Sequence, residues 1–191
     1  MPDDRPPRFP PLSRETMTPA QRTAAEAIAA GPRGGLRGPF QAWLRSPELA
    51  DRLQRVGEYL RFSSAVPRRL NELAILITAR AWDAQFEWWA HHRLALEAGL
   101  DPAVAADIAE GRRPAAMQPD EAVVYDFCTQ LRATRRVGDA TLAAAIELLG
   151  EQGVVDLIGV SGYYDVVSMT LNVAEVALPD GVEPPLKPLP R

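Results

Sequence analysis

The fold of this chain is decided by residues 67–100, PRRLNELAILITARAWDAQFEWWAHHRLALEAGL, in which two helical patterns follow each other across a short break. Pro67 suits the first turn of a helix, and residues 70–77 are apolar almost all round, which predicts a central, buried helix. A second helix is predicted over about residues 83–98, and Gly99 is a suitable residue to end it. The stretch therefore predicts two consecutive helices, of which the first lies in the core.

Nearly everything else between the two ends of the chain also carries helical patterns. Glycine and proline in residues 31–40 predict a loop. The segment 150–176 contains valines and tyrosines that favour strand, and Gly153, Gly159 and Gly162 lower its helix propensity. More than twenty residues without a turn signal is nevertheless too long for a typical strand. The other predicted helices begin at or near Thr18, Ser46, Asp101, Pro119, Asp139 and Gly150. The sequence thus predicts an all-α protein of seven or eight helices.

One stripe in this pattern predicts how a helix is oriented. In the helix that begins at Ser46, four apolar residues recur at helical spacing and predict a buried face. These residues are Leu49, Leu53, Val56 and Leu60.

The two ends differ from the middle in composition, because both are rich in proline and charge. We expect residues 1–17 to form an extended N-terminal arm, residues 18–177 a single all-α domain, and residues 178–191 a proline-rich C-terminal tail. Such ends have no core of their own. Two interpretations stay open: they pack on a neighbouring subunit, or they hang free.

Composition excludes several classes of protein. The 191 residues carry a formal net charge of −4 and no dense run of Lys or Arg, which argues against a nucleic-acid partner. The single cysteine excludes an internal disulfide. No signal-peptide core is seen at the N-terminus, and the acids in 154–176 would be costly in a bilayer. We therefore expect a soluble, cytoplasmic protein that does not enter a membrane.

The segment Phe86–His92 holds both histidines of the chain and is the first candidate for chemistry. Glu87 and His91 are four residues apart, so a helix places them on one face within contact distance. A carboxylate that orients an imidazole forms a general acid/base pair, and Trp88 and Trp89 would supply apolar walls that exclude water. The alternative is a surface salt bridge, worth only about a few tenths of a kcal/mol.

A metal site is a third interpretation of the same segment. His92 points about 100° away from His91 on a helix, so the two histidines do not readily chelate one ion. The sequence also lacks a His-Glu-x-x-His motif. We expect neither a metal nor a cofactor.

Three other residues or pairs carry polar groups in apolar surroundings. Glu72 lies in the most apolar helix, where a carboxylate has a raised pKa or a partner, and Arg68 and Arg69 are near enough in sequence to pair with it. Tyr163 and Tyr164 could line a pocket or simply pack. Cys128 falls on a core stripe, as a small apolar residue would.

The run PRRLNELAILITARAWDAQFEWWAHHRLALEAGLDPAVAADIAEG (67–111) resembles the core of the carboxymuconolactone decarboxylase family, which also contains the alkylhydroperoxidase AhpD-like proteins. The features that carry the resemblance are a carboxylate at the start of one helix, a second helix with Glu-x-x-x-His, and an Ala-x-x-Ala-Gly-Leu turn. It implies an AhpD-like helical bundle built on a central helical hairpin, assembled as a trimer or hexamer.

The peroxidase branch of that family uses a Cys-x-x-Cys pair, a histidine four residues later and an upstream glutamate that relays protons. Glu72 and His91 match the glutamate and the histidine, but Ala84 and Glu87 occupy the cysteine positions. Because the thiolate is the nucleophile, dithiol peroxide reduction is not expected here. A peroxidase that uses Cys128 instead is a remote alternative.

The decarboxylase branch lacks the cysteines and has a glutamate four residues before its histidine, as Glu87 stands before His91. The resemblance implies a cofactor-free lyase that acts on a small carboxylated or lactone-like molecule, with His91 as proton donor and Glu87 as its orienter. Arg68 and Arg80 are the candidates for holding a substrate carboxylate. Trp88, Trp89 and Tyr163 would line a site for an apolar or aromatic part of the ligand.

A second hypothesis belongs to a different class: an oligomeric small-molecule binder that kept the fold and lost the reaction. It predicts that Glu87 and His91 form a salt bridge with no cavity beside them. A cavity bordered by both residues would count against it.

Overall fold

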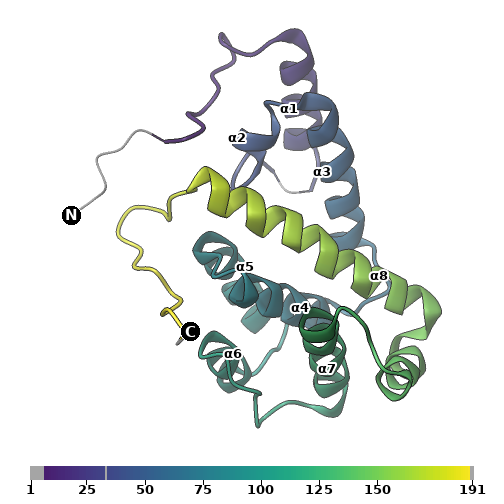
Figure 1. Ribbon diagram of the computed structural model, residues 1–191. Coiled ribbons are helices and arrows are strands. Elements are labelled where there is room, and N and C mark those ends of the chain that lie inside the picture. The colour runs from purple at the N-terminus through teal and green to yellow at the C-terminus, as the bar shows by residue number, and fades with distance from the viewer. Residues whose placement is uncertain (1–6, 33, 190–191) are drawn as a thin grey trace.

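Eight helices and no strand make up the part of the chain that the structure, a computed structural model, describes: residues 7–32 and 34–189 (Figure 1). The helices are α1 (Pro19–Ala30), α2 (Phe40–Trp43), α3 (Pro47–Phe62), α4 (Arg68–Ala81), α5 (Gln85–Glu97), α6 (Pro102–Ala109), α7 (Pro119–Thr134) and α8 (Asp139–Ala174). The all-α prediction is confirmed. The count agrees as well, although α2 was not predicted and the last two predicted helices are joined in α8.

Helix α8 bends where the sequence predicts one helix to end and another to begin. Gly150 has φ 68° and ψ 172°, which is not helical, and a residue without a Cβ adopts this conformation at least cost. Beyond the bend, α8 runs across the molecule, with α1–α3 on one side and α4–α7 on the other (Figure 1). It contacts α3, α4, α5 and α7.

Helix α4 is the central element, as its apolar pattern predicts. Every residue from Leu70 to Arg80 is buried, and the helix packs against α5, α6, α7 and α8. The chain then turns through residues 82–84, where Asp83 has a positive φ of 50°, and returns as α5. Helices α4 and α5 therefore form an antiparallel pair in the core.

The predicted buried face of α3 is only partly correct. Leu60 is buried, but Leu49 and Val56 are each 48% exposed, and the helix instead turns Ala50, Gln54 and Gly57 inward. Ala50 and Gly57 are small residues, so the side of α3 that faces the core and its neighbours α1 and α8 is not its most apolar side. Tyr59 and Phe62 add to an apolar surface on α3 that nothing in the described chain covers.

Asp156, on α8, holds the connection between α3 and α4. Its carboxylate accepts a hydrogen bond of 2.7 Å from the backbone N–H of Ala65 and bonds of 3.1 Å from the hydroxyl of Tyr59. The residue is buried, and these donors compensate the cost of burying its charge. Three parts of the fold, namely α3, the α3–α4 connection and α8, thus meet at the side chain of Asp156.

The described residues of both ends pack on the chain's own helices. In the N-terminal arm, the guanidinium of Arg8 donates to the carbonyl of Val173 at 2.9 Å and pairs with Glu175. In the C-terminal tail, Leu186 is buried and exchanges two backbone-to-amide hydrogen bonds with Gln85, at 2.9 and 3.0 Å. Residues 1–6 of the predicted arm and 190–191 of the tail lie outside the described residues.

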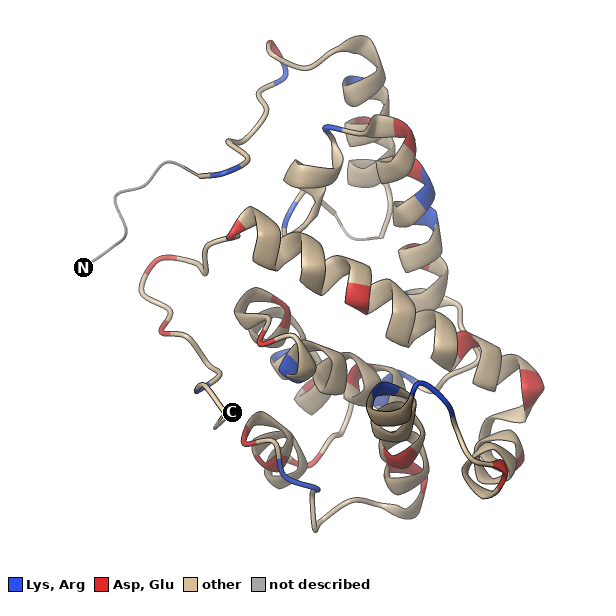
Figure 2. Cartoon of the chain, in the orientation of Figure 1, with Lys and Arg blue, Asp and Glu red and all other residues tan. Residues whose placement is uncertain are grey.

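Charged residues of the two signs alternate along α3, whereas the charged residues of α8 are all acidic (Figure 2). On α3, for example, Glu48 pairs with Arg52 and Asp51 with Arg55, one helical turn apart. Within residues 7–32 and 34–189, none of the helices combines the length and the apolar character that crossing a bilayer requires.

Candidate active site

The α4–α5 pair brings together the three residues that the sequence singles out for chemistry. Nδ1 of His91 lies 2.6 Å from a carboxylate oxygen of Glu72, and Nε2 lies 3.1 Å from a carboxylate oxygen of Glu87. The residues are 5%, 6% and 3% exposed, respectively. One imidazole is therefore held between two buried carboxylates, a group that we call the Glu72–His91–Glu87 triad.

Local structure explains half of this arrangement and the hairpin explains the rest. Glu87 and His91 are one turn apart on α5, so the helix itself brings them into contact. Glu72 lies 19 residues before His91 and reaches it only because α4 and α5 pack side by side. The suggested pairing of Glu72 with neighbouring arginines is wrong, because Arg69 instead pairs with Asp120 and Glu121 on α7.

The triad is charged at neutral pH. Burial alone would lower the pKa of His91, but electrostatic attraction and hydrogen bonds from Glu72 and Glu87 outweigh burial and raise the pKa to about 9. Only the protonated ring carries N–H groups on both nitrogens, and therefore only this form donates to both carboxylates at once. His91 thus carries a proton that it can donate within a buried site.

A cavity of about 190 Å³ is bordered by Glu87 and His91. Its walls come from the loop before α2, from α3, α5 and α8, and they include Arg37, Arg61, Phe86, Tyr163, Tyr164 and Val167. A larger cavity of about 630 Å³ is bordered by Glu72. The two carboxylates of the triad therefore border different cavities.

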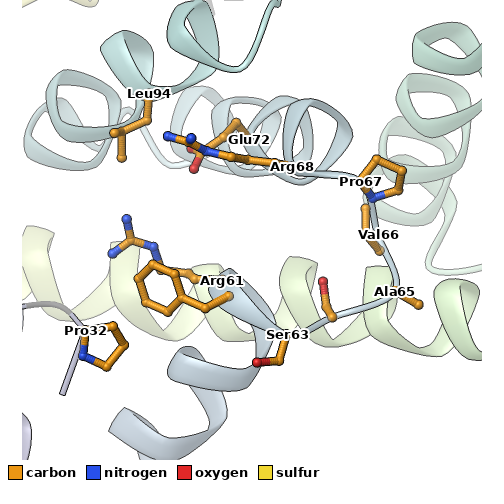
Figure 3. A pocket seen from close by; sticks show the side chains of 11 residues that line it. Pro32, Arg61, Ser63, Ala65, Val66, Pro67, Arg68, Glu72 and Leu94 are labelled. Carbon is orange, nitrogen blue, oxygen red and sulfur yellow. The ribbon is translucent and has the colours of Figure 1, made fainter.

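Arg61 borders both cavities and was not singled out in the sequence. Figure 3 shows it reaching into the larger cavity from the α3 side, opposite Arg68 and Glu72 on the α4 side. Among the described residues, no carboxylate lies within ion-pair distance of Arg61, whose charge instead lies 5.1 Å from the ring centre of Phe62. The sequence did contain one signal for Arg61. Both helices that flank the α3–α4 connection were predicted, and Arg61 stands just before that connection.

Arg37 is the second cation that sequence reasoning missed. It lies in the glycine-rich loop of residues 31–40 and borders the smaller cavity with Glu87 and His91. No carboxylate of the described chain pairs with it either. Nothing in a loop sequence reveals which helix the loop covers, so no local pattern could have placed this arginine.

The structure brings two of the five predicted ligand-binding residues to these cavities. Arg68 borders the larger one and Tyr163 the smaller one. Trp88 is instead a core residue whose ring stacks on His92, and Trp89 packs on Phe86. Trp88 and Trp89 follow Glu87 by about 100° and 200° around the helix, so they do not share its face.

Arg80 is the fifth predicted residue, and it lies away from the triad. Its guanidinium donates to the carbonyls of Ala109 and Lys187, at 2.9 and 3.0 Å, and pairs with Asp83. It borders a separate cavity of about 560 Å³ between α4, α6, α7 and the C-terminal tail. Arg80 therefore anchors the tail to the α4–α5 turn.

Cys128 is buried on α7, with Sγ 3.8 Å from the hydroxyl oxygen of Ser161 on α8. Burial raises the pKa of its thiol to about 11, more than the contacts with Ser161 and Arg132 lower it. Reactive cysteines have lowered pKa values and partial exposure, so Cys128 has the character of a packed core residue.

No group of three or more His, Cys, Asp or Glu side chains is placed to hold a metal ion in the described part of the chain. Comparison with the sequence patterns of known families gives no match. Comparison with curated proteins gives no match either.

Proposed function

We propose that the protein is a cofactor-independent acid/base lyase of the carboxymuconolactone decarboxylase type, acting on a small carboxylated or lactone-like molecule. The observation that carries the proposal is a buried imidazolium held by two carboxylates beside a cavity of about 190 Å³. Buried charges are costly, and groups with strongly shifted pKa values gather at sites that move protons.

Each member of the triad has a role in this proposal. Glu72 makes the shorter contact, to Nδ1, and orients the ring. Nε2 faces Glu87, which borders the smaller cavity and passes the proton between His91 and the substrate. Glu87 is therefore a shuttle in this proposal, and Glu72 takes the orienting role that the resemblance gives to Glu87.

The reaction needs no redox partner. When the bond between the substrate carbon and its carboxylate breaks, CO₂ leaves and the electron pair delocalises into the neighbouring carbonyl as an enolate. His91 passes the proton on its Nε2 to Glu87, and Glu87 gives it to the substrate carbon to form the new C–H bond, which leaves His91 neutral until solvent returns a proton. Low exposure of the site strengthens these electrostatic interactions because little water competes for them.

The unpaired arginines determine what kind of ligand the cavity favours. Arg37 and Arg61 border the same cavity as Glu87 and His91, and both lack a carboxylate partner in the described chain. A guanidinium binds a carboxylate through two parallel hydrogen bonds. We propose that these two residues hold a substrate carboxylate, with Arg68 facing the larger cavity beside Glu72.

A non-catalytic binder with the same fold is the alternative. It would keep Glu87 and His91 only as a structural salt bridge, with no hollow beside them. The cavity that both residues border favours the lyase.

Replacing Glu87 with glutamine tests the proposal. Wild-type protein should release CO₂ from a panel of γ-lactones and β-oxo acids that carry a carboxylate. The Glu87→Gln variant should be about 10²–10⁴-fold slower, because the amide cannot carry the proton. Released CO₂ is measured with carbonate-free buffer and an infrared detector.

Glu147→Gln is the matched control, since this carboxylate is exposed on the first part of α8. Its rate should equal that of wild type. Equal rates for Glu87→Gln and wild type would contradict the proposal, as would the absence of turnover on every member of the panel.

We also propose that the protein is a cytoplasmic homo-oligomer, a trimer or a hexamer. Two helices carry apolar side chains that the described chain leaves uncovered: on α3 these are Leu49, Val56, Tyr59 and Phe62, and on α8 Val155, Ile158, Met169 and Val173. Apolar stripes of this length are typical of surfaces that associate. Light scattering of the purified protein should give three or six times the chain mass, and a monomer would contradict this part of the proposal.

A further inference from the structure

The hydroxyl of Tyr164 is a buried polar group without a hydrogen-bond partner among the described residues. Tyr164 lies on α8 and is 2% exposed, one of the largest fully buried side chains of the fold. Leaving a buried donor unpaired is costly, so native proteins seldom do it without a reason. The missing partner needs an explanation.

The surroundings of this hydroxyl supply one. Tyr164 borders the cavity of about 190 Å³ together with Glu87 and His91, and its ring packs edge-on against His91 with centroids 5.1 Å apart. The phenol also interacts electrostatically with Arg61 and with both carboxylates of the triad. The unpaired donor is therefore part of the wall of the proposed reaction site.

Other unpaired buried side-chain atoms of the described chain do not have this position. Nε of Arg80 and Nε of Arg132 belong to residues that border the cavity beside the tail, while Asn71 and Ser168 border none of the cavities described above. Tyr164 alone in this group borders a cavity with Glu87 and His91.

We propose that Tyr164 is a catalytic residue whose hydroxyl donates a hydrogen bond to an oxyanion of the bound ligand, the enolate oxygen that forms when CO₂ leaves. The inference rests on the proposed function and adds a group to it. Three groups then act on one intermediate: arginine holds a carboxylate that the ligand keeps, Glu87 delivers the proton, and Tyr164 stabilises the oxygen that carries the electron pair.

The protonation state of the phenol suits this role. Burial raises the pKa of Tyr164 well above its usual value, and Glu87, Glu72 and Tyr163 raise it further, while Arg61 lowers it. The group is therefore a neutral donor at neutral pH. A donor that is fixed before the reaction costs no reorganisation when charge develops.

A phenolate tests the site without any knowledge of the substrate. 4-Nitrophenolate carries its charge on one oxygen next to a flat ring, as a dienolate does, and its absorbance reports the ionised form. Nitrobenzene has the same ring without that oxygen. The full-length protein should bind 4-nitrophenolate more tightly than nitrobenzene and should lower the apparent pKa of the bound phenol.

The Tyr164→Phe variant removes only the donor. It should bind 4-nitrophenolate about 10- to 100-fold more weakly, and nitrobenzene as wild type does. Its unfolding midpoint should equal or exceed that of wild type, because an unpaired buried hydroxyl has been removed; a merely structural hydroxyl would lower the midpoint. Tyr125→Phe, which alters the cavity beside the tail, is the control and should bind both probes as wild type does.

The outcomes separate the two proposals. Loss of 4-nitrophenolate binding in Tyr164→Phe, with no CO₂ release by wild type, supports the oxyanion site and contradicts the lyase. CO₂ release by wild type that persists in Tyr164→Phe, with unchanged 4-nitrophenolate binding, overturns the role of Tyr164 and leaves the lyase standing. Equal binding of both probes by wild type also overturns it.

Discussion

Replacing His91 with alanine should lower the free energy of unfolding by about 3–5 kcal/mol at neutral pH. The substitution leaves Glu72 and Glu87, which the imidazolium now holds apart, as two buried carboxylates without a cation. The loss should shrink as the pH falls, because protonation of one of the two carboxylates removes the repulsion between them. Urea unfolding at pH 5 and pH 7 measures both effects.

His92→Ala is the control for this prediction. The ring of His92 is half-buried and stacks on Trp88, but it holds no carboxylate. Its removal should cost far less than removal of His91, and the cost should not shrink at low pH. A His91→Ala variant as stable as wild type at pH 7 would show that the triad is not a buried ion cluster.

The pKa values of the two histidines should be shifted in opposite directions from the usual value of 6.5. His91 should titrate near pH 9, because Glu72 and Glu87 outweigh the effect of burial, whereas burial lowers the pKa of His92. Since the chain has only these two histidines, NMR of the ring protons resolves both curves. Because the folded-state pKa of His91 is raised, its contribution to stability is complete below about pH 6.5 and is lost as the pH rises through about 9.

Glu72→Gln identifies the cause of the shift. Removing this carboxylate should lower the pKa of His91 while leaving that of His92 unchanged, because only His91 contacts Glu72. A His91 that titrates at or below pH 6.5 in wild type would mean a neutral ring, and the stored proton of the proposed mechanism would be absent.

The sequence predicts those contacts that lie within one helix. Glu87 and His91 follow from a spacing of four residues, and the break at Gly150 follows from a residue that helices disfavour. The pairing of Glu72 with His91 has no such local signal, since 19 residues and a turn separate them. At the level of sequence, only the resemblance to a family predicted that Glu72 and His91 act together.

Contacts between distant elements account for what sequence reasoning missed. Arg61 and Arg37, which were not singled out, come from α3 and a loop, and they border the same cavity as Tyr164 on α8. Trp88, next to Glu87 in sequence, faces the core. The sequence predicts large apolar residues on the inward face of α3, whereas the small residues Ala50 and Gly57 lie there in the structure. The packing of the whole fold determines which surfaces meet, and the residue pattern of one helix does not reveal that packing.

Asp156 links the longest helix to the α3–α4 connection at the edge of the larger cavity, and this limits how the sequence of that connection can diverge. The residues it fixes, between Phe62 and Pro67, also line that cavity. An insertion or deletion there would pull the backbone N–H of Ala65 off its acceptor and shift Arg61 and Arg68 relative to each other. Homologous chains that share this chemistry should therefore conserve the length of that connection.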